Sequence, residues 1–258
     1  MICKICGNEA EKKFVVKIMR KYEAEYFNCS KCGFLFAGNP VWLDESYKNA
    51  INISDTGIMD RNLHYSRIVS LLVYFMFDKN KKFVDYAGGY GIFTRLMRDI
   101  GFDFYWQDIY CENLLSRGFE YKPELQKNIE LITAFEVYEH LVDPMNEIKK
   151  MIDISGNIIF STLLLSEPVP EPGEWWYYGF EHGQHISFYS HKTLSYIAEK
   201  SGLHFYSYKD VHLFTRKKLN NNVFKALILF SKLGLSFYVK KKLKSKIWED
   251  HILLENNK

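Results

Sequence analysis

The sequence feature that most constrains the fold is a glycine-rich turn between two apolar runs, residues 83–93, which read FVDYAGGYGIF. An apolar run, an acid, a small-residue turn and a second apolar run are typical of a buried strand that leads into a helix past a bound ligand. Glycines allow the backbone to approach a ligand because no Cβ stands in the way. The stretch therefore predicts a ligand site at the carboxyl end of a strand.

Strand-like and helix-like segments alternate around this turn, from Lys82 to about Lys217. Such alternation predicts a Rossmann-like, doubly wound α/β fold with a mostly parallel sheet and an antiparallel edge. A segment with helical period at 59–77 is expected to pack beside that sheet. We expect seven strands, at 82–87, 102–108, 118–121, 129–135, 156–164, 203–210 and 211–217, and helices at 93–101, 144–153 and 190–203.

Four of the five cysteines fall in two close pairs near the N-terminus, Cys3 with Cys6 and Cys29 with Cys32. A glycine follows each C-x-x-C pair, which lets backbone amides turn toward the thiolate sulfurs. Two such pairs, with 22 residues between them, predict a tetrahedral four-cysteine zinc ribbon whose intervening residues form two short strands. Because four thiolates leave no open position, this zinc is expected to be structural.

Charge and apolar runs limit the partners and the location. The N-terminus lacks the apolar core of a signal peptide and no run of 18 apolar residues occurs, so a cytoplasmic location is expected. The net charge of +3 is too small to predict a polyanionic partner, but the ten Lys and Arg residues between Val211 and Trp248 are not balanced by any acid. This basic stretch is expected to be helical and to dock on the domain, with weak contact to an anionic membrane surface as the alternative. We divide the chain into a zinc ribbon at 1–45, a ligand-binding domain at 46–217 and a basic helical segment at 218–258.

The glycine turn does not suit a phosphate-rich ligand. A dinucleotide fold uses G-x-G-x-x-G, but Thr94 stands where the third glycine is needed, and no Walker-type Gly-Lys-Ser/Thr follows. Asp85 places negative charge before the turn, which favours a cation. Asp108, which ends the next strand, has the offset at which a carboxylate accepts the hydroxyls of a ribose. The predicted ligand has a ribose, a cationic group and no phosphate, and S-adenosylmethionine meets this description.

Two segments resemble the class I S-adenosylmethionine-dependent methyltransferases. The segment VDYAGGYG resembles their first motif, D-x-G-x-G-x-G, with Ala87 in place of the first glycine, and ITAFEVYEHLVDP at 132–144 is similar to their fourth-strand segment. The resemblance implies that Glu139 and His140 lie just beyond the cofactor, although both also suit the start of a helix. The implied cofactor site consists of Asp85, Ala87, Gly88, Gly89, Gly91, Asp108, Phe135 and Glu136.

A third segment, GEWWYYGFEHGQHISFYS at 173–190, resembles bacterial methyltransferases that modify sugars, often in surface-polysaccharide or deoxysugar pathways. Sugar C-methyltransferases with an N-terminal zinc module carry a Glu-His pair where this chain has Gln184 and His185. The resemblance covers residues 1 to about 215, and those enzymes are usually longer. It implies a sugar acceptor site that includes Gln184, with aromatic rings that stack on the sugar or cover the cofactor: Trp175, Trp176, Tyr177 and Tyr178.

Methyl transfer to a sugar hydroxyl needs a general base, and histidine is the side chain best suited to that task near neutral pH. We expect His185 to be the base, with His182 as the second choice and Glu139 and His140 as further catalytic candidates. Gln184, in place of Glu, lacks a charge suited to C-methylation, which favours O-methylation, with C- or N-methylation as alternatives. No second metal site is predicted. A zinc-ribbon nucleic-acid-binding protein is the alternative of another class, and it is disfavoured because the ribbon is not strongly basic.

Overall fold

The computed structural model describes residues 1–48 and 55–256, and the chain forms two compact units. Unit 1 comprises residues 1–52, 135–153 and 160–216, and unit 2 comprises residues 53–134, 154–159 and 217–258. Each unit therefore contains segments that lie far apart in the sequence. The division into domains at 1–45, 46–217 and 218–258 stays a prediction.

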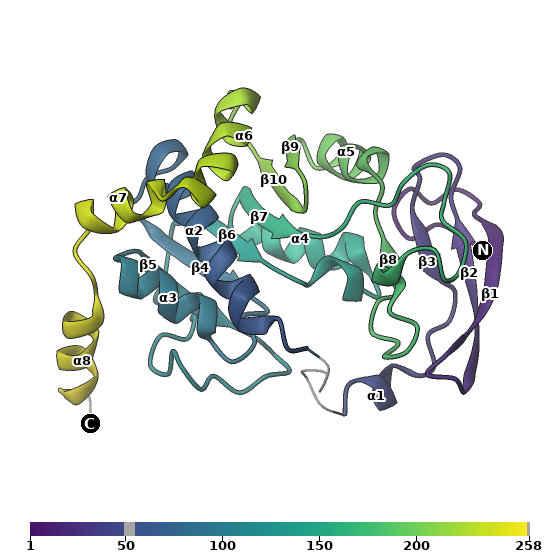
Figure 1. Ribbon diagram of the computed structural model, residues 1–258, viewed down its shortest axis with the longest axis horizontal. Helices are drawn as coiled ribbons and strands as arrows, with labels where there is room; N and C mark the ends of the chain where they lie inside the picture. Colours follow the sequence, from purple (N-terminus) through teal and green to yellow (C-terminus); the bar gives the residue numbers. More distant parts are fainter. Residues whose placement is uncertain (49–54, 257–258) are drawn as a thin grey trace. The chain divides into compact units, whose positions relative to one another are not determined.

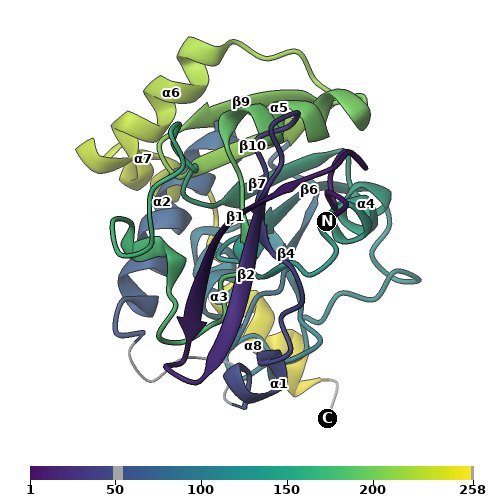
Figure 2. The same ribbon diagram turned by 90° about the vertical axis from the view of Figure 1, so that its right-hand side faces the viewer.

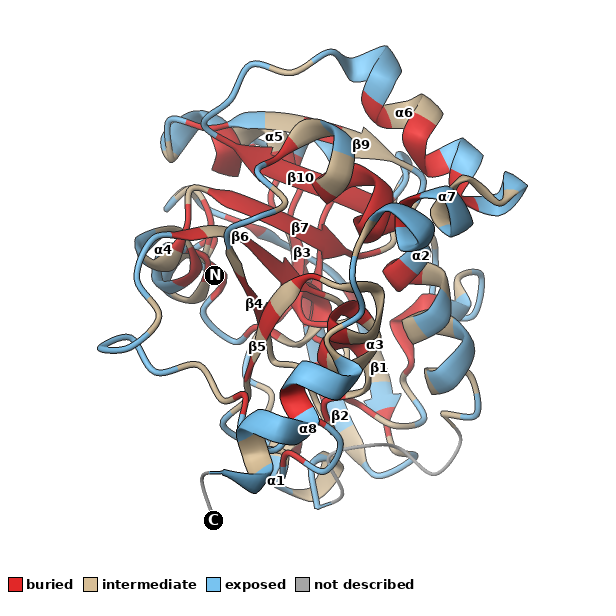
Figure 3. Cartoon of the chain, turned by 90° about the vertical axis from the view of Figure 1, so that its left-hand side faces the viewer, coloured by how far each residue is buried: buried red, intermediate tan, exposed pale blue. Residues whose placement is uncertain are grey.

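The predicted Rossmann-like mixed α/β fold is confirmed, with a six-stranded sheet in the order β5-β4-β6-β7-β10-β9. Strand β4 runs parallel to both β5 and β6, and β9 pairs with β10 in antiparallel fashion at the edge. The inner strands β4, β6, β7 and β10 are mostly buried and are largely red in Figure 3, because both faces of the sheet interior are covered. The strands are β4 (Lys82–Tyr86), β5 (Asp103–Gln107), β6 (Ile129–Ala134), β7 (Asn157–Ser161), β9 (His204–Tyr208) and β10 (Val211–Thr215).

The prediction of a seventh strand at 118–121 is wrong for the described residues. This segment makes only one isolated parallel bridge, between Glu120 and Trp106 of β5. Gly118 has a φ of 88° on one side, and Pro123 lacks an N–H donor on the other. Both interrupt the extended pairing that a strand needs.

In unit 1 the N-terminal residues form a small sheet in the order β1-β2-β3-β8 (Figure 1), whose two long strands β1 and β2 lie side by side in Figure 2. The predicted pair of short strands is confirmed as the antiparallel hairpin of β1 (Glu11–Ile18) and β2 (Tyr22–Asn28). Strand β3 (Leu35–Ala37) continues the sheet, and β8 (Ser187–Phe188) pairs with it from a distant part of the chain. The N-terminal ribbon and the 187–188 segment thus belong to one sheet.

The helices of unit 1 begin where capping rules predict. Ser190 accepts a hydrogen bond from the backbone N–H of Thr193 before α5 (His191–Lys200), and the two residues form a capping box. Pro144 is the first residue of α4 (Pro144–Ile154), where its missing N–H costs nothing. A short helix, α1 (Leu43–Ser46), follows the ribbon.

Unit 2 carries the helices around the glycine turn. Helix α2 (Ile58–Met76) contacts α3 (Ile92–Ile100), α6 (Asn221–Phe230) and α7 (Leu235–Lys242). The last helix, α8 (Ile247–Glu255), closes the chain (Figure 1).

The tie between α8 and α3 is a buried ion pair. Both guanidinium Nε and Nη2 of Arg98 donate to the carboxylate of Asp250, at 2.8 and 2.6 Å. The two parallel bonds make the pair bidentate. Both residues are only 3% exposed, so the pair is nearly free of water.

Among the described residues no single helix is long and apolar enough to cross a membrane. The bent pair Asn221–Leu233 and Leu235–Lys242, at 91°, passes that test only by length and composition.

Candidate functional site

The glycine turn of unit 2 joins β4 to α3 and takes a left-handed backbone at three positions. Gly89 and Gly91 have φ of 53° and 83°, and Ala87, which replaces the first glycine of the motif, has φ of 55°. A Cβ built on Gly89 would meet nothing within 4 Å, whereas one on Gly88 would lie 2.7 Å from the Asp85 carboxylate. The turn therefore needs small residues on its packed side and leaves open space beside Gly89.

Asp85, the acid before the turn, is buried and held by two threonine hydroxyls. Thr133 donates to its Oδ1 at 2.9 Å and Thr94 donates to its Oδ2 at 3.0 Å. Burial raises the pKa of Asp85 to about 7, and the nearby Asp108 carboxylate acts in the same direction. A cationic ligand near these two carboxylates would relieve that penalty.

Asp108 closes the turn from the end of β5. Its Oδ2 accepts from the backbone N–H of Gly89 at 3.0 Å, and its Oδ1 accepts from the N–H groups of Tyr110 and Cys111 at 2.7 and 2.9 Å. A carboxylate has about four lone-pair sites, so Oδ2 keeps one for a ligand hydroxyl. Asp108 thus shapes the turn and retains part of its capacity to hold a ribose.

Two predicted cofactor residues, Phe135 and Glu136, belong to unit 1. Glu136 has a φ of 54°, which is unusual for a residue with a side chain, and strained backbone of this kind concentrates at functional sites. The hydroxyl of Ser161 accepts from its backbone N–H at 2.8 Å and donates to its Oε1 at 2.9 Å. Ser161 therefore fixes both the backbone and the carboxylate of Glu136.

The four predicted metal ligands lie together in unit 1. The Sγ atoms of Cys3 and Cys32 are 3.5 Å apart, those of Cys6 and Cys29 are 3.4 Å apart, and all four lie within 4.8 Å of one another. Sulfurs around a tetrahedral zinc stand about 3.8 Å apart, given Zn–S bonds of about 2.3 Å, whereas a disulfide needs about 2.05 Å. These sulfurs therefore fit a zinc ion.

The two knuckles that present these sulfurs repeat one geometry. Gly7 donates to the carbonyl of Cys3 and Gly33 donates to that of Cys29, and both glycines have a left-handed φ, of 70° and 74°. The second knuckle is anchored to the start of α5, since Thr193 donates to the carbonyl of Cys32 at 2.8 Å. The predicted glycine turns are present, and the contact from Thr193 shows that α5 helps to hold the four-cysteine cluster in place.

The aromatic segment 175–178 is mostly core. Tyr177 and Tyr178 are buried, and Trp175 packs against the same hydrophobic cluster as Phe14, Ile18, Trp42 and Phe188. Of the four rings predicted to contact the acceptor, only Trp176 is largely exposed, at 78%.

The 179–185 loop is held against the ribbon. Trp42 donates from its indole to the carbonyl of Gly183 at 2.7 Å, and Gln184 donates from its amide to the carbonyl of Ser46 at 2.9 Å. His182 accepts from the backbone N–H of Gln184 at 3.1 Å, which assigns it a loop-stabilising contact. The histidine-bearing loop is therefore positioned by the ribbon and the residues after it.

Three of the four predicted catalytic residues, Glu139, His140 and His185, come together in unit 1. Their ligand atoms lie within 4.8 Å of one another. His185 Nδ1 lies 2.6 Å from the carbonyl oxygen of Tyr177, and His140 Nδ1 lies 3.0 Å from that of Gln184. Because a carbonyl only accepts, Nδ1 of His185 carries the proton and its Nε2 keeps a lone pair. Nδ1 of His140 also lies 2.9 Å from the hydroxyl of Tyr47, which can donate to it or accept from it.

The electrostatics of this cluster are unusual. Burial lowers the pKa of His185 to about 2 and that of His140 to about 4, so both rings are neutral near pH 7. Burial also raises the pKa of Glu139 to about 8, and the neighbouring Glu136 carboxylate adds to this shift. Perturbed titratable groups of this kind are typical of functional sites.

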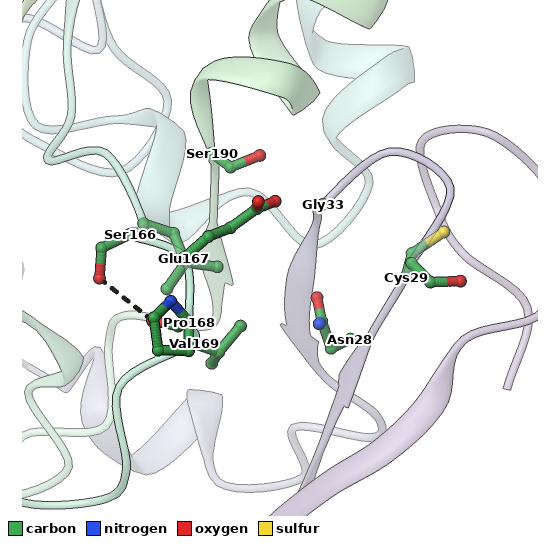
Figure 4. A pocket seen from close by; sticks show the side chains of 10 residues that line it. Asn28, Cys29, Gly33, Ser166, Glu167, Pro168, Val169 and Ser190 are labelled. Atoms are coloured by element: carbon green, nitrogen blue, oxygen red, sulfur yellow. Dashed lines mark hydrogen bonds between the residues drawn. The ribbon is translucent and has the colours of Figure 1, made fainter.

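A pocket of about 260 Å³ lies elsewhere in unit 1. Figure 4 shows it between the second zinc knuckle and the 165–169 segment, with the side chain of Glu167 near Ser190. Of the predicted site residues, only the zinc ligand Cys29 lines it. The residues around it are Asn28, Cys29, Ser30, Gly33, Leu165, Ser166, Glu167, Pro168, Val169 and Ser190.

Comparison with known proteins identifies the family. A family model described as "Methyltransferase domain" matches residues 59–208, more than half of the chain. The chain belongs to this family. No curated protein matches the sequence of this methyltransferase.

Solved structures with a similar fold include methyltransferases. TnmH is 15% identical with a TM-score of 0.45, over 69% of this chain and 61% of TnmH. Human N-acetylserotonin methyltransferase in complex with SAM is 14% identical with a TM-score of 0.42, over 69% of this chain and 66% of that enzyme. Magnesium protoporphyrin IX methyltransferase from Synechocystis PCC 6803, with bound SAH, is 11% identical with a TM-score of 0.44, over 68% of this chain and 93% of that enzyme. The methyltransferase thus spans less than two thirds of the first two proteins.

Several residues that shape the site were not predicted. Thr94 and Thr133 bind Asp85, and Ser161 binds Glu136. Thr94 carried a signal, because a hydroxyl at the place of the third dinucleotide glycine points to another use of that position. Thr133 and Ser161 lie inside apolar strand runs, where a single small polar residue gives no comparable signal.

Proposed function

We propose that this chain is an S-adenosylmethionine-dependent methyltransferase that methylates a hydroxyl of a sugar, either nucleotide-linked or part of a surface polysaccharide. The methyltransferase family supports the reaction class. The single observation that carries the choice of a hydroxyl acceptor is the cluster of Glu139 with two neutral imidazoles, since an alcohol must lose its proton when it is methylated.

The donor site assigned in this proposal is the glycine turn of unit 2. S-adenosylmethionine supplies a methyl group on a positively charged sulfonium. Asp85 and Asp108 provide negative charge beside the turn, and the space next to Gly89 admits a ligand close to the backbone. Asp108 accepts a ribose hydroxyl on the lone pair that its backbone contacts leave over.

The proton acceptor in this proposal is His185. The acceptor oxygen forms a bond to the methyl carbon as the carbon–sulfur bond breaks, S-adenosylhomocysteine leaves, and the hydroxyl proton passes to Nε2 of His185. The Tyr177 carbonyl holds the ring in the tautomer that presents this lone pair. The low pKa keeps His185 unprotonated before the reaction. Proton transfer to His185 requires the ionised form of Glu139, whose negative charge would stabilise the imidazolium.

The sugar is proposed from the resemblance of residues 173–190 to sugar methyltransferases. Trp176, whose ring is exposed, is the residue of this segment most suited to stack on a sugar face. The four-cysteine site holds a structural zinc in this proposal, which stabilises the ribbon against which the 179–185 loop packs.

A direct assay tests the function. The full chain is incubated with S-adenosylmethionine and a panel of nucleotide-linked sugars and surface-polysaccharide fragments, and products are analysed by mass spectrometry. We expect one methyl ether on a sugar and an equal amount of S-adenosylhomocysteine. Donor binding, measured by calorimetry, combined with methylation of no sugar but of a carbon or nitrogen nucleophile, would overturn the acceptor class and keep the family.

A further inference from the structure

Two clusters of side chains among the described residues have the geometry to hold a metal ion. One is the four-cysteine site of the ribbon. The other is formed by Glu139, His140 and His185, whose three ligand atoms lie within 4.8 Å of one another. Two imidazoles and one carboxylate are a donor set that recurs in protein sites for divalent metal ions.

The carboxyl group of this cluster makes no hydrogen bond to the described residues. Glu139 is 0% exposed, and neither of its oxygens has a hydrogen bond. The hydroxyls of Thr162 and Tyr177 are near enough to lower its pKa but make no hydrogen bond of acceptable geometry to it, and they lie 3.3 Å from each other. Burying a carboxylate without hydrogen bonds or a counter-ion is costly, which indicates that a further group belongs there.

Each histidine places one ring nitrogen within 4.8 Å of a Glu139 carboxylate oxygen. The Tyr177 carbonyl takes the Nδ1 proton of His185, so Nε2 of that ring keeps a lone pair. Nε2 of His140 lies 4.0 Å from Oε1 of Glu139. Metal-binding histidines are usually oriented by a hydrogen bond from the other ring nitrogen to a carbonyl or carboxylate, such as the bond from Nδ1 of His185 to Tyr177. Three ligand atoms this close together, one of them from a buried carboxyl group, require a proton or a cation among them.

We propose that Glu139, His140 and His185 bind one divalent transition-metal ion, such as Zn²⁺, Mn²⁺ or Fe²⁺. Imidazole and carboxylate ligands suit these ions, whereas soft thiolates bind the ribbon's zinc. Three protein ligands leave at least one coordination position for an oxygen of another molecule.

The ion site does not rest on the proposed function, but assigning its open position to the acceptor hydroxyl does. With the ion bound, Nε2 of His185 is a ligand and no longer a proton acceptor. A hydroxyl bound to a divalent ion has a lower pKa, so the ion would replace the imidazole as the group that favours deprotonation. The cluster could therefore assist methyl transfer with the ion bound or, through His185, without it. A turnover rate that depends on added metal would distinguish the first case from the second.

Metal binding to the full chain is the test. The purified protein, with loosely held metal removed by a mild chelator, is titrated with Mn²⁺, which suits nitrogen and oxygen donors and not four thiolates. We expect one Mn²⁺ per chain, with imidazole nitrogen coupling in pulsed electron paramagnetic resonance. Glu139→Gln, which keeps the side-chain size, should weaken binding by about 100-fold or more, since loss of even an outer contact costs about 10–100-fold.

The controls separate lost ligation from lost folding. His191→Ala removes an exposed imidazole of unit 1 outside the cluster and should leave Mn²⁺ affinity unchanged. The zinc content of the four-cysteine site, measured by mass spectrometry, should be equal in Glu139→Gln and the unmodified chain.

Absence of Mn²⁺ and of a second Zn²⁺ equivalent, or a bound Mn²⁺ without nitrogen coupling, would overturn the site. So would affinity that is unchanged in both Glu139→Gln and His185→Ala. A chain that binds the ion but methylates no hydroxyl would refute the proposed function and leave the ion site standing.

Discussion

Two buried carboxylates, Asp85 in unit 2 and Glu139 in unit 1, have opposite surroundings. Burial raises the pKa of both, to about 7 and about 8. Asp85 is nevertheless satisfied by the hydroxyls of Thr94 and Thr133, while Glu139 has no hydrogen bond. A carboxylate that the protein satisfies can act as part of a scaffold. One that it leaves unsatisfied needs a proton or a cation from outside.

The largest expected effect is on the stability of unit 1, which holds Glu139 and also the four-cysteine site. Replacing one zinc ligand, as in Cys6→Ser, should destabilise unit 1 by many kcal/mol, because structural zinc contributes about 10–16 kcal/mol in small zinc domains. Thermal unfolding should show a lower midpoint in Cys6→Ser and in the chelator-treated chain. Cys111→Ser is the matched control, since Cys111 lies outside the cluster, and an equal loss in that variant would contradict the assignment.

The next effect separates the two carboxylates by function. Glu139→Gln should lower turnover about 10²–10⁴-fold, the range for loss of acid–base assistance, while the dissociation constant for S-adenosylmethionine stays the same. Steady-state kinetics and calorimetry check the two quantities. A variant with normal turnover would remove Glu139 from the reaction.

Asp85→Asn should change how stability depends on pH. In the folded state the pKa of Asp85 is raised from 3.8 to about 7. Below about pH 4 the group is protonated in both states, and as pH rises to about 7 only the unfolded state releases the proton. Asp85 therefore lowers stability across this window, by about 4 kcal/mol at most.

Denaturant unfolding from pH 4 to 8 measures this difference. The Asn variant should gain stability relative to the original chain as pH rises. Parallel pH curves for the two proteins would show that Asp85 does not titrate in this window.

Asp108→Ala should weaken donor binding by about 10–100-fold, because it removes a ribose contact and three backbone hydrogen bonds that hold the turn. Asp108→Asn tests whether the charge or the hydrogen bonds matter more, since Asn retains one oxygen acceptor. Calorimetry that finds unchanged affinity in both variants would argue against the ribose assignment.

The smallest effect is expected at Ala87. Its left-handed backbone costs about 1–2 kcal/mol, and Ala87→Gly removes that cost but adds about 0.4–1 kcal/mol of unfolded-state entropy. A net gain of about 0–1.6 kcal/mol follows, and denaturant midpoints would reveal it. Ala134→Gly, at a position without positive φ, should instead destabilise the chain.

Much of the fold could be predicted from the sequence because the signals are local. Alternating apolar segments located the strands of the sheet within a few residues, and Pro144 and Ser190 marked helix starts through backbone chemistry that depends only on neighbours. The segment at 118–121 misled for the same reason: its residues suit a strand, but pairing length depends on Gly118 and Pro123 beside it.

The site was less predictable because its properties depend on contacts between distant residues. The spacing of the cysteines was enough to predict a four-thiolate cluster. Nothing in the sequence near Glu139 predicted that it would be buried without a hydrogen bond, or that the carbonyl of Tyr177 would fix the tautomer of His185. Nor did the WWYY segment reveal that three of its rings join or pack against a core shared with the ribbon.

The pairing of β8 with β3 limits where the chain can change in length near His185. Strand β8 begins two residues after His185 and pairs with β3 of the ribbon, so a one-residue insertion between His185 and β8 would either move the imidazole or shift the strand register and turn its side chains to the opposite face. Evolutionary change in loop length is therefore tolerated better in the exposed stretch at 166–174, upstream of the fixed point. Homologues that modify different acceptors should differ in length there and keep the spacing from 185 to 188 constant.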